Sequence, residues 1–111
     1  MLKSFAVAFR GIFLLIQSER NFKIHCVALI CVCATGLYFE INRFDWIIII
    51  LTSALVLGLE GVNSALEKLC DEVTEERKES IRTIKDIASG AVLIGAIAAI
   101  VVAGLIFSSY F

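Results

Sequence analysis

The sequence contains no proline and only seven glycines in 111 residues, so little in it interrupts a long helix. It also lacks an excess of charge of either sign, because ten Lys and Arg residues face eleven Asp and Glu residues. A chain with a formal net charge of −1 has neither the basic surface that binds nucleic acid nor an acidic tail. These absences predict an all-α protein and argue against nucleic acid as a partner.

Apolar residues make up 59% of the chain, and its mean hydropathy is +0.92. Soluble domains are usually about 45–50% apolar. A soluble chain of this length buries only about two thirds of its surface, which cannot hide so many apolar side chains. We therefore expect one membrane-embedded domain over residues 1–111. Its four cysteines are expected to act as small apolar residues, and Cys70 faces either the functional site or a neighbouring helix.

Three apolar stretches predict membrane-spanning helices, at about 24–39, 46–59 and 87–107. The third has 21 residues without a charge, which is enough to cross about 30 Å of hydrocarbon. The first and second have 16 and 14 residues and are extended by flanking apolar side chains. Small residues recur at four-residue spacing in the third stretch and predict a helix-packing ridge: Ala91, Gly95, Ala99 and Ala103.

The basic residues predict how the chain crosses the membrane. Nine of the ten lie before the first span or between the second and third, whereas only Arg43 lies between the first and second. Because Lys and Arg concentrate on the cytoplasmic side, this asymmetry predicts a cytoplasmic N-terminus, three spans and a C-terminus outside.

Residues 1–20 predict an amphipathic helix on the cytoplasmic membrane surface. Arg10 divides this apolar region and no small-residue cleavage site follows, which argues against a secretory signal. One apolar stripe at helical spacing carries Leu2, Phe5, Phe9, Ile12, Phe13 and Ile16.

A polar stripe follows the second apolar stretch. At 100° per residue its members fall within an arc of about 100° on one helix face: Glu60, Asn63, Ser64, Glu67 and Asp71. Glu60 comes directly after the apolar stretch, so its carboxylate is expected at the membrane boundary, where it could take a proton from a lipid headgroup. The alternative is an acidic face that is simply solvated.

Other charged residues are expected at the same membrane level. Glu19 could join Glu67 in supplying two carboxylates to Mg²⁺, while Lys85 and Asp86 stand where the third span begins, suited to a nucleotide. Together they predict an MgATP site, although the sequence has neither a phosphate-binding P-loop motif nor the protein-kinase signatures. His25 is expected to be a hydrogen-bonded interfacial histidine rather than a metal ligand.

Three segments together resemble the prokaryotic diacylglycerol kinase family. They read EGVNSALEKLCD at 60–71, IKDIASGAV at 84–92 and SERNFKIH at 18–25. They are similar to the family elements E-x-x-N-[ST]-A-[IL]-E-x-x-x-D, A-K-D-x-[AG]-[AS]-[AG]-A-V and E-x-N-F-[RK]-I-H. The sequence Asn-Phe-Lys-Ile-His looks more like that of the undecaprenol kinase branch, and His25 stands where the diacylglycerol-specific branch has an acidic residue.

The resemblance implies a homotrimeric inner-membrane kinase that transfers phosphate from MgATP to a lipid hydroxyl, either of diacylglycerol or of undecaprenol. By position, the resemblance implies that Glu60 is the general base, that Glu19 and Glu67 bind the metal and ATP, and that Asn63 orients the site. The resemblance also implies that Lys85 binds phosphate, that Asp86 contacts the nucleoside and that Ser89 contacts the lipid. Glu76 and Lys78 are implied to contact the nucleotide. The sequence around Glu76 and Lys78 differs from the usual sequence of the family at this point.

Two other functions compete with the kinase. A small oligomeric transporter or channel would be expected to carry an ionisable residue near the middle of a span, and the three predicted spans contain none. A non-catalytic membrane assembly subunit would rely on the small-residue ridge and would be indifferent to Glu60→Gln.

Overall fold

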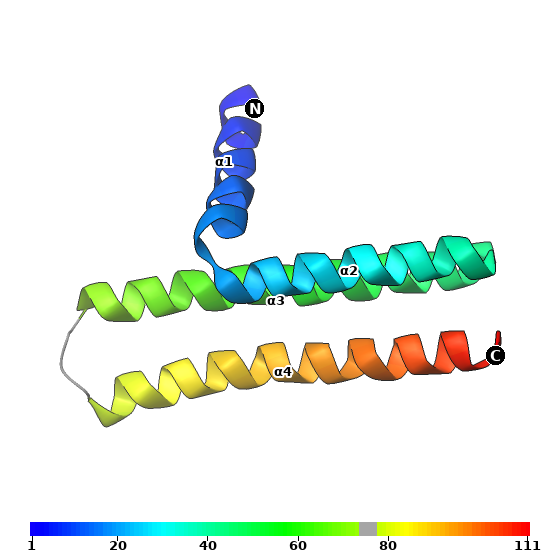
Figure 1. Ribbon diagram of the computed structural model, residues 1–111. Helices are drawn as coiled ribbons and strands as arrows, with labels where there is room; N and C mark the ends of the chain where they lie inside the picture. Colours follow the sequence, from blue (N-terminus) through cyan, green and yellow to red (C-terminus); the bar gives the residue numbers. More distant parts are fainter. Residues whose placement is uncertain (74–77) are drawn as a thin grey trace.

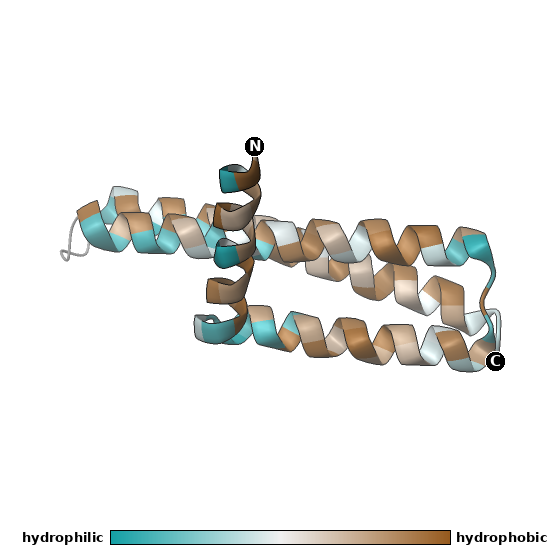
Figure 2. Cartoon of the chain, turned by 90° about the horizontal axis from the view of Figure 1, so that it is seen from above, coloured by the Kyte–Doolittle hydropathy of each residue, from teal (hydrophilic) through white to brown (hydrophobic). Residues whose placement is uncertain are grey.

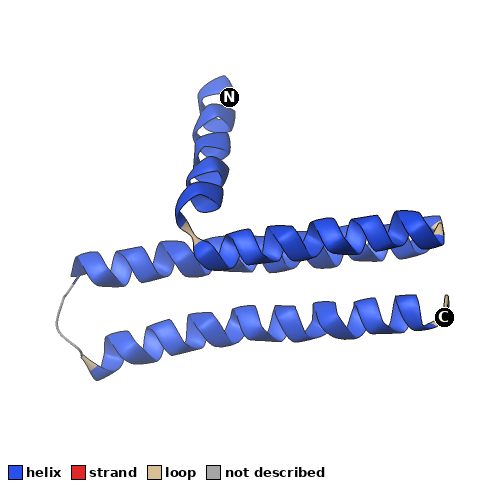
Figure 3. Ribbon diagram, viewed as in Figure 1, coloured by secondary structure: helices blue, strands red, loops and turns tan. Residues whose placement is uncertain are grey.

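The computed structural model describes residues 1–73 and 78–111, and helices account for nearly all of them (Figures 1 and 3). The helices are α1 (Leu2–Ser18), α2 (Arg20–Phe39), α3 (Arg43–Val73) and α4 (Glu79–Ser108). No strand occurs within the described ranges, so the prediction of an all-α chain is confirmed. Helices α2, α3 and α4 lie along a common direction, while α1 projects across them from the start of α2 (Figure 1).

Three of these helices are long and apolar enough to cross a membrane. Mean hydropathy over the most apolar stretch is 1.8 in α2, 1.8 in α3 and 2.7 in α4, which confirms the prediction of three potential spans. Helix α3 does not end where its apolar stretch ends at Leu59. It continues without a break to Val73, so the polar stripe stands on a direct extension of a membrane-length helix.

A single extended residue separates α1 from α2. Glu19 has φ −104° and ψ 112°, which interrupts the helical backbone without a glycine or a proline. Its N–H donates to the Leu15 carbonyl at 3.0 Å, and its own carbonyl accepts from the Lys23 N–H at 3.1 Å. Because both neighbouring helices use its backbone, the side chain of Glu19 is held at the bend between them.

The turn from α2 to α3 is closed by a helix-capping motif. Glu40 adopts a left-handed conformation with φ 52°, and the N–H of Ile41 donates back to the Gly36 carbonyl at 3.2 Å. Asn42 then caps α3, since its Oδ1 accepts from the Asp45 N–H at 2.8 Å. One cap at the end of α2 and another at the start of α3 thus let the chain reverse its direction within a few residues.

The C-terminal end of α4 is tied to the same turn. The Tyr110 hydroxyl donates to Asp45 Oδ2 at 3.0 Å and accepts from the Asn42 N–H at 3.3 Å. A small apolar cluster of Ile41, Ile49 and Ile106 packs beside it. This end of the bundle therefore fixes how α4 lies against α3.

Away from their polar ends, the three long helices consist mostly of apolar residues (Figure 2). Large side chains exposed along the three long helices include Ile30, Leu37, Leu51, Ile94 and Ile100. So much exposed apolar surface is costly in water and requires a cover of lipid or of other protein.

Gly36→Ala is expected to lower the free energy of unfolding by about 1–3 kcal/mol, because overpacking strains a close contact. The added Cβ would lie 2.9 Å from Trp46 Cη2 and 3.1 Å from Ile41 Cδ1. Thermal unfolding in detergent micelles measures the change. Gly104→Ala is the matched control, since a Cβ there meets nothing within 4 Å. Equal destabilisation by both substitutions would contradict the packing argument.

Candidate active site

Helix α3 turns the first three residues of its polar stripe inward and part of its apolar side outward. Glu60, Asn63 and Ser64 are only 3%, 6% and 3% exposed, whereas Val62 and Leu69 are 60% and 59% exposed. This distribution is the reverse of that in a soluble helix and is typical of a helix surrounded by lipid or apolar protein surface. The alternative of a solvated acidic face therefore does not describe these three residues.

Glu60 lies against a histidine from the neighbouring helix. The Nε2 atom of His25, in the second turn of α2, is 3.6 Å from Glu60 Oε2. Both side chains are mostly buried, with 25% of His25 and 5% of Glu60 exposed. A buried carboxylate is costly without polar neighbours, and His25 is the neighbour that the fold supplies.

Asn63 and Glu67 lie one turn apart and interact along α3. Asn63 Nδ2 donates to Glu67 Oε1 at 3.5 Å, a long hydrogen bond. The Oδ1 atom of Asn63 is buried and accepts no hydrogen bond within the described part of the chain. A buried acceptor without a donor is costly, so this oxygen is a candidate to accept a hydrogen bond from a ligand.

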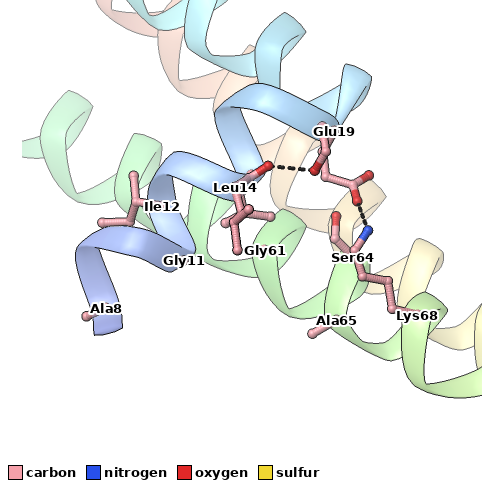
Figure 4. Close-up of a pocket in the computed structure, with 11 residues that line it drawn as sticks. Ala8, Gly11, Ile12, Leu14, Glu19, Gly61, Ser64, Ala65 and Lys68 are labelled. Carbon is pink, nitrogen blue, oxygen red and sulfur yellow. Dashed lines mark hydrogen bonds and ion pairs between the residues drawn. The ribbon is translucent and has the colours of Figure 1, made fainter. Parts of the chain in front are cut away.

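Glu19 reaches from the α1–α2 bend to α3, where its carboxylate pairs with the ammonium of Lys68 (Figure 4). The pair lies at the polar rim of a groove of about 410 Å³ between α1 and α3. The groove is otherwise largely apolar and is lined by Ala8, Gly11, Ile12, Leu14, Leu15, Ser18, Gly61, Ser64 and Ala65.

A second ion pair joins α3 to α4. Lys85 Nζ lies 2.7 Å from Asp71 Oδ1. This hydrogen bond raises the pKa of Lys85, and the bond to Glu19 likewise raises the pKa of Lys68, so both amines are protonated at neutral pH. Cys70, which precedes Asp71, is buried.

The remaining predicted residues are on the surface of the chain. Asp86 and Ser89 are exposed on α4, and neither forms a side-chain hydrogen bond or ion pair within the described residues. Lys78 is the exposed N-cap residue of α4. Glu76 lies outside the described residues.

The carboxylates near Lys68 suit a metal ion that arrives with a nucleotide. Among residues 1–73 and 78–111, no three His, Cys, Asp or Glu side chains gather into a metal-binding cluster. Mg²⁺ bound to a nucleotide needs only one or two protein carboxylates, since phosphate oxygens and water complete its shell. Glu19, which pairs with Lys68, and Glu67, the residue before Lys68, are the two carboxylates that could hold such a nucleotide-bound ion.

The sequence did not predict the partners of two residues that the fold brings to the site. Lys68 was counted only among the basic residues, although it follows Glu67 directly. The contact of His25 with Glu60 joins different helices and leaves no signal in either segment. Ser64 was recognised within the stripe, and the structure adds that it lines the groove beside α1.

Comparison with known proteins identifies relatives over nearly the whole chain. The profile of the prokaryotic diacylglycerol kinase family matches residues 6–107. The chain is 35% identical over 105 residues to the undecaprenol kinase of Bacillus subtilis, covering 95% of this chain and 85% of that protein. It is 36% identical over 105 residues to the diacylglycerol kinase of Synechocystis, covering 94% of this chain and 60% of that protein. It is 25% identical over 111 residues to the diacylglycerol kinase of Escherichia coli, covering all of this chain and 91% of that protein.

His25→Leu is expected to lower the free energy of unfolding by about 1–3 kcal/mol, because Glu60 would lose its polar neighbour while still buried. Thermal unfolding in detergent micelles measures this loss. His25→Gln is the control, because its amide can still donate toward Glu60 and should retain more of the stability. A His25→Leu variant as stable as the parent would show that the contact contributes nothing.

Proposed function

The chain belongs to the prokaryotic diacylglycerol kinase family, and on that premise we propose that it transfers the γ-phosphate of MgATP to the hydroxyl of a membrane lipid. It is a lipid kinase, a phosphotransferase with an alcohol acceptor, rather than a transporter, channel or non-catalytic assembly subunit.

The observation that carries the proposal is the burial of Glu60 at the end of the apolar stretch of α3. A carboxylate at this depth can reach a lipid hydroxyl and is an acceptor for its proton. Glu60 accepts the hydroxyl proton as the lipid oxygen attacks the γ-phosphorus. The bond from that phosphorus to the bridging oxygen breaks, and ADP leaves.

The nucleotide lies beyond Glu60, toward the end of α3. Glu19 and Glu67 would hold the Mg²⁺ that accompanies ATP, which would supply charge neutralisation at the phosphates. Lys85 contacts phosphate, and Asp86 contacts the nucleoside. Asn63 orients the site through its bond to Glu67.

Three further residues complete the proposed site at its edges. Ser89, exposed on α4, contacts the lipid. Lys78 and Glu76 contact the nucleotide from the connection between α3 and α4. Phosphoryl transfer asks mainly for positioning and charge neutralisation, which these side chains and the ion supply without a P-loop.

The proposed assembly is a homotrimer in the bacterial inner membrane. Its N-terminus and the α3–α4 connection lie in the cytoplasm, and its C-terminus lies outside, as the distribution of Lys and Arg favours. The exposed apolar side chains of α2, α3 and α4 supply surface for both lipid and neighbouring subunits. Helix α1 lies on the cytoplasmic membrane surface, and its direction across the bundle supports this placement (Figure 1).

The acceptor is a lipid alcohol, and two are proposed. Relatives of nearly equal identity are named undecaprenol kinase and diacylglycerol kinase. Both lipids present a hydroxyl at the membrane surface, so the chemistry required of Glu60 is the same. Labelled γ-phosphate transfer from MgATP to each lipid in mixed micelles identifies the preferred acceptor.

Glu60→Gln is expected to reduce phosphoryl transfer by about 100-fold or more, because the amide cannot take the hydroxyl proton. The rate is measured with labelled MgATP and the preferred lipid. Glu72→Gln is the matched control, since it makes the same chemical change at an exposed position of α3 outside the polar stripe and should leave the rate unchanged.

Equal activity of Glu60→Gln and the parent would remove Glu60 from the mechanism. Absence of transfer to either lipid by a folded oligomer would overturn the proposed substrates. Retention of helicity and oligomer size by the variant, measured by circular dichroism and size-exclusion chromatography, separates a chemical defect from misfolding.

A further inference from the structure

One of the two carboxylates proposed to bind Mg²⁺ already forms an ion pair with a lysine. The ammonium of Lys68 pairs with Glu19 and bridges the α1–α2 bend to α3 (Figure 4). Lys68 also follows Glu67, the second proposed ligand, directly in α3. One positive charge therefore already lies at the proposed ion site.

The two partners differ in how firmly they are held. The Glu19 side chain is 21% exposed and starts from a backbone fixed by both neighbouring helices, whereas the Lys68 side chain is 65% exposed. A lysine has a long flexible stem and a compact charge that water solvates strongly. Lys68 can therefore swing into water at small cost while Glu19 stays in place.

We propose that the ammonium of Lys68 is the resident counter-ion of the nucleotide site and that Mg²⁺ arriving with ATP displaces it from Glu19. This inference rests on the proposed function, because that function places the ion at Glu19 and Glu67. Lys68 is a positioning residue: it keeps the carboxylates neutralised and oriented until the cation replaces it.

Electrostatics determines the direction of the exchange. Without Lys68, the mostly buried Glu19 carboxylate would lose the ammonium that pairs with it, so Lys68 stabilises the nucleotide-free protein. A divalent ion carries twice the charge of the ammonium and is attracted more strongly by the same carboxylates. In the exchange, however, the ion must compete with Lys68, so the lysine lowers the affinity of the site for free metal.

Lys68→Gln is therefore expected to bind Mn²⁺, used as a paramagnetic probe for Mg²⁺, about three- to tenfold more tightly than the unchanged protein. Binding is measured on the full chain in detergent micelles, with and without a non-hydrolysable ATP analogue, from the electron paramagnetic resonance signal of free Mn²⁺. Lys23→Gln is the matched control. It removes the same charge from an exposed position one turn beyond Glu19 and should shift the affinity less than twofold.

Two further measurements keep the test independent of activity. Lys68→Arg retains a cation and should bind Mn²⁺ as weakly as the unchanged protein. Without metal, Lys68→Gln should melt at a lower temperature than the unchanged protein, and saturating Mg²⁺ should recover a larger part of its stability than it adds to the unchanged protein.

Unchanged or weaker Mn²⁺ binding by Lys68→Gln overturns the proposal, because it would make the ion pair a structural support for Glu19. If such a variant still transfers phosphate from MgATP, the kinase function stands without the exchange. Failure of the unchanged protein to transfer phosphate to either lipid would instead overturn the kinase proposal, whatever its affinity for Mn²⁺.

Discussion

The rest of the structure depends on one constraint, which is that the outside of the bundle is apolar and leaves only the inside for polar side chains. Helix α3 meets it by turning Glu60, Asn63 and Ser64 inward. Buried polar groups need partners, so α2 must bring His25 to Glu60. Helix α3 packs against both α2 and α4, and each supplies a polar partner for a different part of the stripe: His25 for Glu60 and Lys85 for Asp71.

The stripe changes in character along its length. It begins with a deeply buried carboxylate at Glu60, passes through the half-buried Glu67 and ends at the exposed Asp71. A lipid alcohol and a water-soluble nucleotide require opposite surroundings. A helix that runs from one to the other brings both within reach of one set of side chains.

The sequence was sufficient for features that depend on one helix at a time. Apolar length predicted three helices able to cross a membrane, and helical periodicity predicted the stripe, because each needs only residues near in sequence. The contacts of His25 and Lys68 join helices whose mutual rotation no single segment encodes. No glycine or proline in the sequence predicts the bend at Glu19, since the bend depends on how both helices pack.

The unbroken course of α3 beyond Leu59 has a consequence for the spacing of the two substrates. Seven residues, about two turns or roughly 10 Å, separate Glu60 from Glu67 along a continuous helix. The helix is continuous between them, so the helical rise fixes the distance between Glu60 and Glu67. This distance in turn sets how far the lipid alcohol lies below the nucleotide, as a ruler would. A single inserted residue would lengthen that ruler by about 1.5 Å and would also rotate its far end by about 100°, carrying Glu67 off the face it shares with Glu60.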